Sequence, residues 1–130
     1  MHKRILLAIL VGLLIPLPQT VVPAWTAQVV DESGAPQPGA TVREVWRQYS
    51  LESASYHDQR NTDAKGMVSF PRRSLWRPAI VNLIGIVRNR MKDGNRALYG
   101  PVAYLVASRG NAQSFTDRCG NCKMVLHAMR

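Results

Sequence analysis

VVDESGAPQPGATV, residues 29–42, joins two short apolar runs through a segment dominated by turn-forming residues. Gly34 can adopt the positive φ that a tight turn requires, whereas Pro36 and Pro38 hold φ at about −65°. Asp31 can accept a hydrogen bond from the backbone amide two residues later. The pattern predicts a strand, a turn and a second strand.

A similar turn precedes a strand in residues 62–71. Asp63 and Gly66 bracket this turn, and Val68 and Phe70, two residues apart, lie on one face of the strand that follows. The two segments together predict a small β-sandwich. Its turn-defining residues are Asp31, Gly34, Gly39, Asp63 and Gly66.

The strands on either side of the first turn are predicted at residues 26–31 and 39–46, and we expect them to pair with each other. In the second of them, strict alternation places Val42 and Val45 on opposite faces. Either a bulge at residues 43–44 restores the register, or both faces of the strand are partly buried.

Three later segments complete the predicted sandwich. Residues 47–61 are mostly polar and predict an exposed strand and a loop. Residues 97–108 are apolar at both alternating sets of positions, which is typical of a central strand covered on both sides. Residues 123–129 predict the terminal strand.

The turn glycines and strand residues of segments 30–36, 39–42, 62–66 and 68–71 resemble those of the carboxypeptidase regulatory-like domain. That family is a transthyretin-like, Greek-key β-sandwich. The resemblance covers residues 26–71 and implies a mainly β fold of about seven strands. It also implies a non-catalytic accessory role in exported proteins, attached to peptidases, outer-membrane receptors or adhesins, or as a separate chain.

The chain departs from that family in a basic insertion at residues 72–96. Apolar side chains recur there at spacings of three and four residues, which predicts one stripe of an amphipathic helix. Ser74 is placed to cap the start of the helix, and Asp93-Gly94 to end it. The stripe and two adjacent arginines form a candidate contact surface, composed of Trp76, Arg77, Ile80, Leu83, Ile84, Val87, Arg88 and Met91.

Two interpretations of this segment remain open. In the first, the stripe packs over an open end or edge of the sandwich and the arginines face water. In the second, the segment lies on an anionic membrane or in the groove of a partner protein, with Trp76 at the interface and the arginines on lipid headgroups.

Residues 1–24 have the organisation of a secretory signal peptide: a basic start, an apolar run and small residues before a cleavage site. The apolar run, residues 5–17, is about 13 residues long, shorter than the roughly 20 that a spanning helix needs. We therefore expect export to the periplasm or the cell exterior, with cleavage near Ala24 or alternatively at Ala27. Residues 25–130 then form a single domain.

The chain is strongly basic, with a formal net charge of +9. Without Lys3 and Arg4, the 17 lysines and arginines become 15 against 8 acidic residues, a net charge of +7. Such a charge favours an anionic partner, for example a membrane surface or a wall polymer. Nucleic acid is not expected as a partner, because the compartments reached by export hold little of it.

Cys119 and Cys122 form the sharpest local motif. In an oxidising compartment the expected outcome is a disulfide that closes the turn before the terminal strand. A redox-active pair is disfavoured, because such pairs are expected at a helix N-terminus in a thioredoxin-like context. Zinc binding together with His57 and His127 is a third alternative, although the spacing fits no common zinc finger.

The sequence shows no paired carboxylates, nucleophile elbow or phosphate-binding glycine loop, so we do not expect an enzyme. We expect no metal or cofactor either, because Asp31 and Asp63 each precede a turn glycine, where a carboxylate caps backbone amides. The predicted function is a non-catalytic, exported binding or structural module of the cell envelope, acting on an envelope protein or an anionic surface. The alternatives are a peripheral membrane protein that binds anionic lipid through residues 72–96, and a small thiol-disulfide factor.

Overall fold

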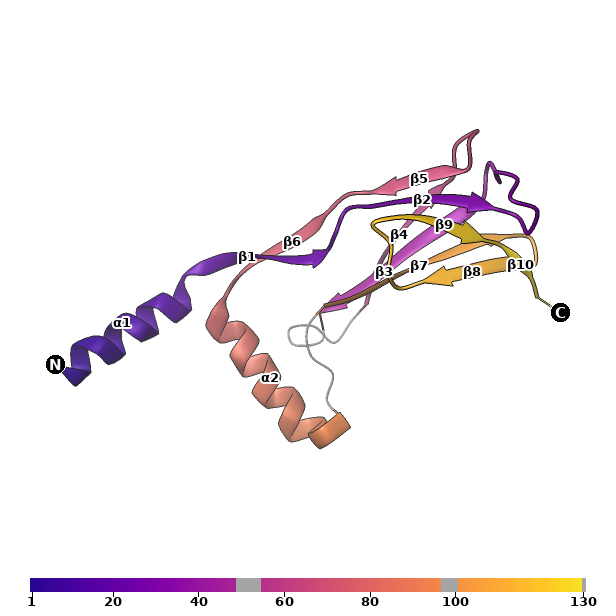
Figure 1. Ribbon diagram of the computed structural model, residues 1–130. Coiled ribbons are helices and arrows are strands. Elements are labelled where there is room, and N and C mark those ends of the chain that lie inside the picture. The colour runs from indigo at the N-terminus through magenta and orange to yellow at the C-terminus, as the bar shows by residue number, and fades with distance from the viewer. Residues whose placement is uncertain (49–54, 97–100, 130) are drawn as a thin grey trace.

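The computed structural model describes residues 1–48, 55–96 and 101–129 (Figure 1). The described part is mainly β, with ten strands and two α-helices. The helices are α1 (His2–Leu14) and α2 (Ala79–Asp93), and a short 3-10 helix (Gly94–Arg96) follows α2. The strands are β1 (Pro16–Val22), β2 (Trp25–Val30), β3 (Thr41–Gln48), β4 (Tyr56–Asn61), β5 (Met67–Phe70), β6 (Arg73–Pro78), β7 (Pro101–Arg109), β8 (Ala112–Thr116), β9 (Asn121–Val125) and β10 (His127–Ala128).

Eight of these strands form two packed sheets, and the other two form a separate ribbon. The larger sheet has the strand order β10-β8-β7-β3-β4, and the smaller has the order β5-β2-β9, in which β2 and β9 are parallel. In the ribbon, β1 pairs antiparallel with β6, and α1 and α2 lie at the end that points away from the sheets (Figure 1). We refer to α1, β1, β6 and α2 together as the arm.

Apolar side chains from both sheets meet between them and form the core, to which β1 also contributes. Val29 on β2 and Val42 on β3 are fully buried, as is Leu105 on β7. The members of the core cluster are Val21, Val22, Trp25, Ala27, Val29, Ala40, Val42, Val68, Phe70, Leu105, Ala107, Cys119, Met124 and Leu126.

The first strand-turn-strand prediction is confirmed for the strands but wrong for their pairing. β2 pairs with β5 and β9, whereas β3 pairs with β4 and β7, so the two strands lie in different sheets. The segment between them crosses from the smaller sheet to the larger. Pro36 and Pro38 favour this crossing over a hairpin, because a proline cannot donate a ladder hydrogen bond.

The pairing of β3 with β7 is regular from Thr41 to Gln48, so no bulge is present. Val42 is buried in the core and Val45 is partly buried on the opposite face, in agreement with the second interpretation of this strand. β7 is a central strand of the larger sheet, as predicted, but its outer face is not fully covered. Val102 is 42% exposed, and Phe115 on the neighbouring β8 is 63% exposed.

The remaining strand predictions hold in part. β4 is the exposed strand predicted within residues 47–61, of which 49–54 lie outside the described residues. β7 begins at Pro101, and residues 97–100 of that prediction likewise lie outside the described part. The predicted terminal strand is divided between β9, which pairs with β2, and β10, which pairs with β8.

Within the basic insertion, the helix begins later than predicted. Residues Arg73–Pro78 form β6, so Ser74 pairs with β1 and does not cap a helix. Pro78 is the N-cap of α2, and because the residue before a proline disfavours the α region, the backbone is extended up to this point. The predicted end is confirmed, since Gly94 is the C-cap with φ of 58°.

Candidate functional site

One face of α2 carries aliphatic side chains that are largely exposed. Their spacing of three and four residues aligns them along the helix, where they line a shallow, open groove. Ile84 is 60% exposed and Met91 is 84% exposed. This surface, which we call the α2 stripe, consists of Ile80, Leu83, Ile84, Val87 and Met91.

Basic side chains border the α2 stripe. Arg88 and Lys92 line the same groove as the aliphatic residues. Arg90 and Lys92 lie in the last turn of the helix, where the helix dipole favours positive charge. Asp93 is the only acidic residue in the sequence from 72 to 96. The surface therefore combines apolar contact area with cationic groups.

In the described part of the chain, the α2 stripe is largely exposed and is not packed on the sandwich, which favours the second of the two interpretations of this segment. α2 lies at the far end of the β1–β6 ribbon, and its main contacts among the described residues are with β6, α1 and the 3-10 helix (Figure 1). Trp76 and Arg77, predicted on the same helical stripe, lie instead on β6, where Trp76 is 69% exposed. The predicted contact surface is thus divided between β6 and α2.

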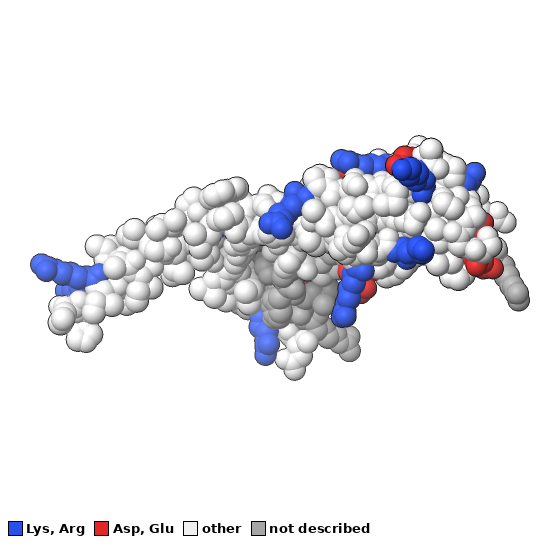
Figure 2. Space-filling model, turned by 45° about the horizontal axis from the view of Figure 1, so that its top comes forward, with Lys and Arg blue, Asp and Glu red and all other residues white. Residues whose placement is uncertain are grey.

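α1 adds a second exposed apolar surface to the arm. None of its residues is buried; Leu6 and Leu7, for example, are 65% and 61% exposed. On the face shown in Figure 2, basic side chains mark the outer end of α1, and the visible acidic side chains lie over the sandwich. Neither α1 nor any other helix of the described residues combines the length and hydropathy needed to cross a bilayer.

An ion-pair network joins the arm to the larger sheet. Arg73, the first residue of β6, donates a hydrogen bond of 2.9 Å from Nε to Oε2 of Glu44 and one of 2.8 Å from Nη2 to Oδ2 of Asp58. Its guanidinium carbon lies 4.1 Å from the centroid of the Trp46 ring, within cation–π distance. Because Glu44 is fully buried, Arg73 is the cation that compensates its charge.

The two carboxyl groups of this network respond differently to their surroundings. Burial raises the pKa of Glu44, and the hydrogen bond and charge of Arg73 counteract this only in part. Burial also acts to raise the pKa of Asp58, but Arg60 and Arg73 outweigh it, so the pKa of Asp58 is lowered. Within the described residues, Oε1 of Glu44 has no hydrogen-bond partner.

The sequence analysis missed this network. The available signal was spacing: Glu44 stands two residues from Val42 and two from Trp46, so alternation along β3 puts its carboxylate on the core side. A buried carboxylate requires a cation nearby. Nothing local in the sequence indicates that Arg73, among many arginines, supplies it.

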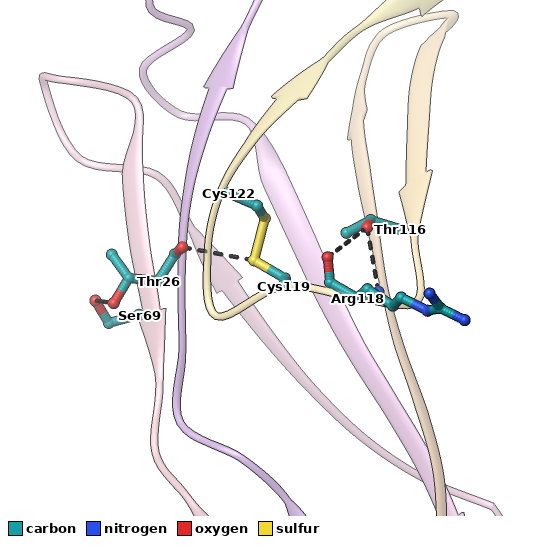
Figure 3. The surroundings of a disulfide bond; sticks show 6 residues. All are labelled: Thr26, Ser69, Thr116, Arg118, Cys119 and Cys122. Atoms are coloured by element: carbon teal, nitrogen blue, oxygen red, sulfur yellow. Dashed lines mark hydrogen bonds between the residues drawn. A yellow bond between two sulfur atoms is a disulfide. The ribbon is translucent and has the colours of Figure 1, made fainter.

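The predicted disulfide between Cys119 and Cys122 is present, in the turn that leads into β9 (Figure 3). Cys119 belongs to the core cluster, and its sulfur lies 3.5 Å from the carbonyl oxygen of Thr26 on β2. Thr116 closes the preceding turn, because its hydroxyl group donates to the carbonyl of Arg118 and accepts from the amide of the same residue. The pair lies between strands, not at a helix N-terminus, a position that favours a structural bond over an exchanging one.

We expect the double variant Cys119→Ser/Cys122→Ser to unfold with a free energy about 2 kcal/mol lower than the wild type, because the bond closes only a very short loop. Urea titration followed by tryptophan fluorescence measures this difference. Reductant should lower the stability of the wild type by a similar amount and leave the variant unchanged. Equal stability of the two proteins without reductant would contradict the prediction.

The predicted turn carboxylates cap backbone amides. Oδ1 of Asp31 accepts hydrogen bonds of 2.9 Å from the amides of Ser33 and Ala35, and Oδ1 of Asp63 accepts from the amides of Lys65 and Met67 at 2.8 and 2.9 Å. The hydrogen bond from the Ser33 side chain is the largest cause of the lowered pKa of Asp31. Both carboxylates thus stabilise the turns.

The three predicted turn glycines, Gly34, Gly39 and Gly66, all have positive φ.

The two histidines of the zinc alternative lie apart. His57 is on β4, whereas Nδ1 of His127 on β10 is 3.2 Å from Oε1 of Glu32. Among the described residues, no three His, Cys, Asp or Glu side chains are grouped so as to hold a metal ion.

Comparison of the chain with family models, curated proteins and solved structures gives no match to any of them.

Proposed function

We propose that the protein is a β-sandwich module held at an anionic membrane surface by the arm, with the α2 stripe in the interface. The observation that carries this proposal is the exposure of the stripe beside Arg88 and Lys92. A helix with an apolar face and a basic border lies in the plane of the interface, its aliphatic groups among the acyl chains and its cations on the headgroups.

The chemistry of the arm suits this environment. Full burial of one large aliphatic side chain contributes about 1.5–3 kcal/mol, so the five residues of the α2 stripe together can offset the cost of immobilising the helix. Each Lys or Arg close to an anionic surface adds about 1 kcal/mol. Trp76 on β6, which is 69% exposed, extends the apolar part of this surface from α2 into the ribbon.

The sandwich itself is proposed to be a non-catalytic, exported module of the carboxypeptidase regulatory-like type. The path of the chain between the two sheets supports a Greek-key topology. β2 lies in the smaller sheet, β3 and β4 lie in the larger sheet, and β5 lies in the smaller sheet again. The disulfide supports an oxidising compartment. In this proposal the arm holds the sandwich, or a partner bound to it, close to the membrane.

Vesicle co-sedimentation tests the membrane proposal directly. The full chain should sediment with vesicles of phosphatidylcholine and phosphatidylglycerol and bind phosphatidylcholine vesicles more weakly, with the difference decreasing at high salt. Ile84→Glu should weaken binding to the anionic vesicles by at least about tenfold, because it removes an aliphatic contact and places an acid in the interface.

Phe115→Glu is the matched control. Phe115 is 63% exposed, close to the 60% of Ile84, and the substitution makes the same change in charge, but on β8 of the sandwich. This variant should bind as the wild type does. The proposal fails if the wild type binds neither vesicle, or if Ile84→Glu and Phe115→Glu weaken binding equally.

A further inference from the structure

The strand β1 lies within the N-terminal segment that has the organisation of a signal peptide, yet it is part of the folded domain. It pairs antiparallel with β6, from Pro16 opposite Pro78 to Thr20 opposite Ser74. Val21 is 5% exposed and Val22 is fully buried, and both belong to the core cluster between the sheets. A leader that is cut away does not normally supply core residues.

Cleavage after Ala24 would therefore change the fold as well as shorten the chain. It would remove the ladder partner of β6 and expose unpaired amide and carbonyl groups along that strand. It would also take Val22 out of a closed position in the core. Arg73 would then attach to Glu44 a segment that has lost its only strand partner among the described residues.

The helix that precedes β1 has surface properties that fit the same membrane as α2. With 13 residues, α1 is about 20 Å long, which is less than the roughly 30 Å thickness of the hydrocarbon core. It contacts α2 at the end of the ribbon, so both helices lie on the same side of the sandwich (Figure 1). Lys3 and Arg4 at its outer end are complementary to anionic headgroups.

We propose that residues 1–22 remain in the mature protein and that α1 lies in one leaflet of the same anionic membrane as α2, an inference that rests on the proposed function. β1 fixes this second membrane contact to the sandwich through its pairing with β6 and through Val21 and Val22. Because α1 and α2 are attached to the same β1–β6 ribbon, membrane binding by one helix gives the other a high effective concentration at the membrane, so the pair holds the module more firmly than α2 alone.

The first experiment determines the N-terminus of the exported protein. The full chain, with a C-terminal tag, is expressed in an exporting bacterium, and the tagged protein is identified by intact mass and N-terminal peptides in membrane and soluble fractions. We expect the membrane fraction to contain chain that retains β1, with peptides from residues 5–22. A chain that begins at Trp25, or at Gln28 after the alternative site, overturns the inference.

The second experiment tests α1 as a membrane contact with purified full chain. Leu7→Glu should weaken binding to phosphatidylglycerol-containing vesicles by at least about tenfold, whereas Phe115→Glu should leave it unchanged. Binding of Leu7→Glu equal to that of the wild type overturns the role of α1. If Ile84→Glu still weakens binding at least about tenfold in that case, the proposed function stands and only this inference fails; if both variants bind normally, both fail.

Discussion

Arg73→Ala should lower the free energy of unfolding by about 3 kcal/mol. The substitution leaves the fully buried carboxylate of Glu44 without its cation, and removal of one partner from a buried pair costs about 3–5 kcal/mol. We expect the lower end of that range, because Arg73 and Asp58 keep 26% and 31% of their side-chain surface exposed. Urea unfolding followed by tryptophan fluorescence measures the change.

Two further variants separate this effect from the general loss of an arginine. Arg43→Ala, on the outer face of β3, removes a guanidinium group that is bonded to Gln59 at the surface, and should change stability by no more than about 0.5 kcal/mol. Glu44→Gln combined with Arg73→Ala should recover part of the loss, since the buried charge is then absent. An Arg73→Ala variant as stable as Arg43→Ala would show that Glu44 does not depend on Arg73.

The dependence of stability on pH gives a second readout of the same pair. Because the pKa of Glu44 is raised above its ordinary value of 4.5, the folded protein keeps a proton that the unfolded chain loses between 4.5 and the raised pKa. Stability therefore rises as pH falls through that window. Removal of Arg73, which lowers this pKa, should widen the window, so Arg73→Ala should regain more stability on mild acidification than the wild type.

Turns and the strands next to them could be predicted from the sequence because their causes are local. Asp31 and Asp63 cap amides within four residues of themselves, and alternation over a few residues suffices to place Val68 and Phe70 together in the core. The disulfide is equally local, since Cys119 and Cys122 are three positions apart. No distant part of the chain is needed for any of these features.

Pairing and the ion-pair network could not be predicted, because they depend on distant residues. The choice of β9 as the parallel neighbour of β2 joins residues almost a hundred positions apart, as in the pairing of Thr26 with Asn121. Glu44 finds its cation 29 residues away. Since several of the predicted strands carry suitable apolar residues, more than one pairing satisfies the local pattern.

The candidate site lies between these two cases. The three- and four-residue period identified the α2 stripe correctly, because periodicity is a local property. The same period also included Trp76, which the structure places on β6. β6 is paired with β1, and β1 lies in the segment whose pattern predicts a removable leader, so the local pattern of residues 72–96 gives no sign of this strand.

Gly66→Ala should lower the free energy of unfolding by roughly 3 kcal/mol or more. At a φ of +73°, any L side chain costs about 1–2 kcal/mol. The added Cβ would also lie 2.6 Å from the carbonyl oxygen of Val29 and 3.0 Å from the amide nitrogen of Gln37, which are backbone atoms and cannot rotate away. Urea unfolding again measures the loss.

The clash at Gly66 is costly because three segments meet there. The amide of Val29 donates to the carbonyl of Gly66 at 2.8 Å, and the carbonyl of Val29 accepts from Gln37 at 2.9 Å, so displacement of one strand disturbs both hydrogen bonds. Gly34→Ala is the matched control: φ is 85°, but its added Cβ meets nothing within 4 Å, so only the backbone cost of about 1–2 kcal/mol applies. Equal losses in the two variants would mean that backbone conformation alone, and not the approach of β2 to this turn, determines the need for glycine at position 66.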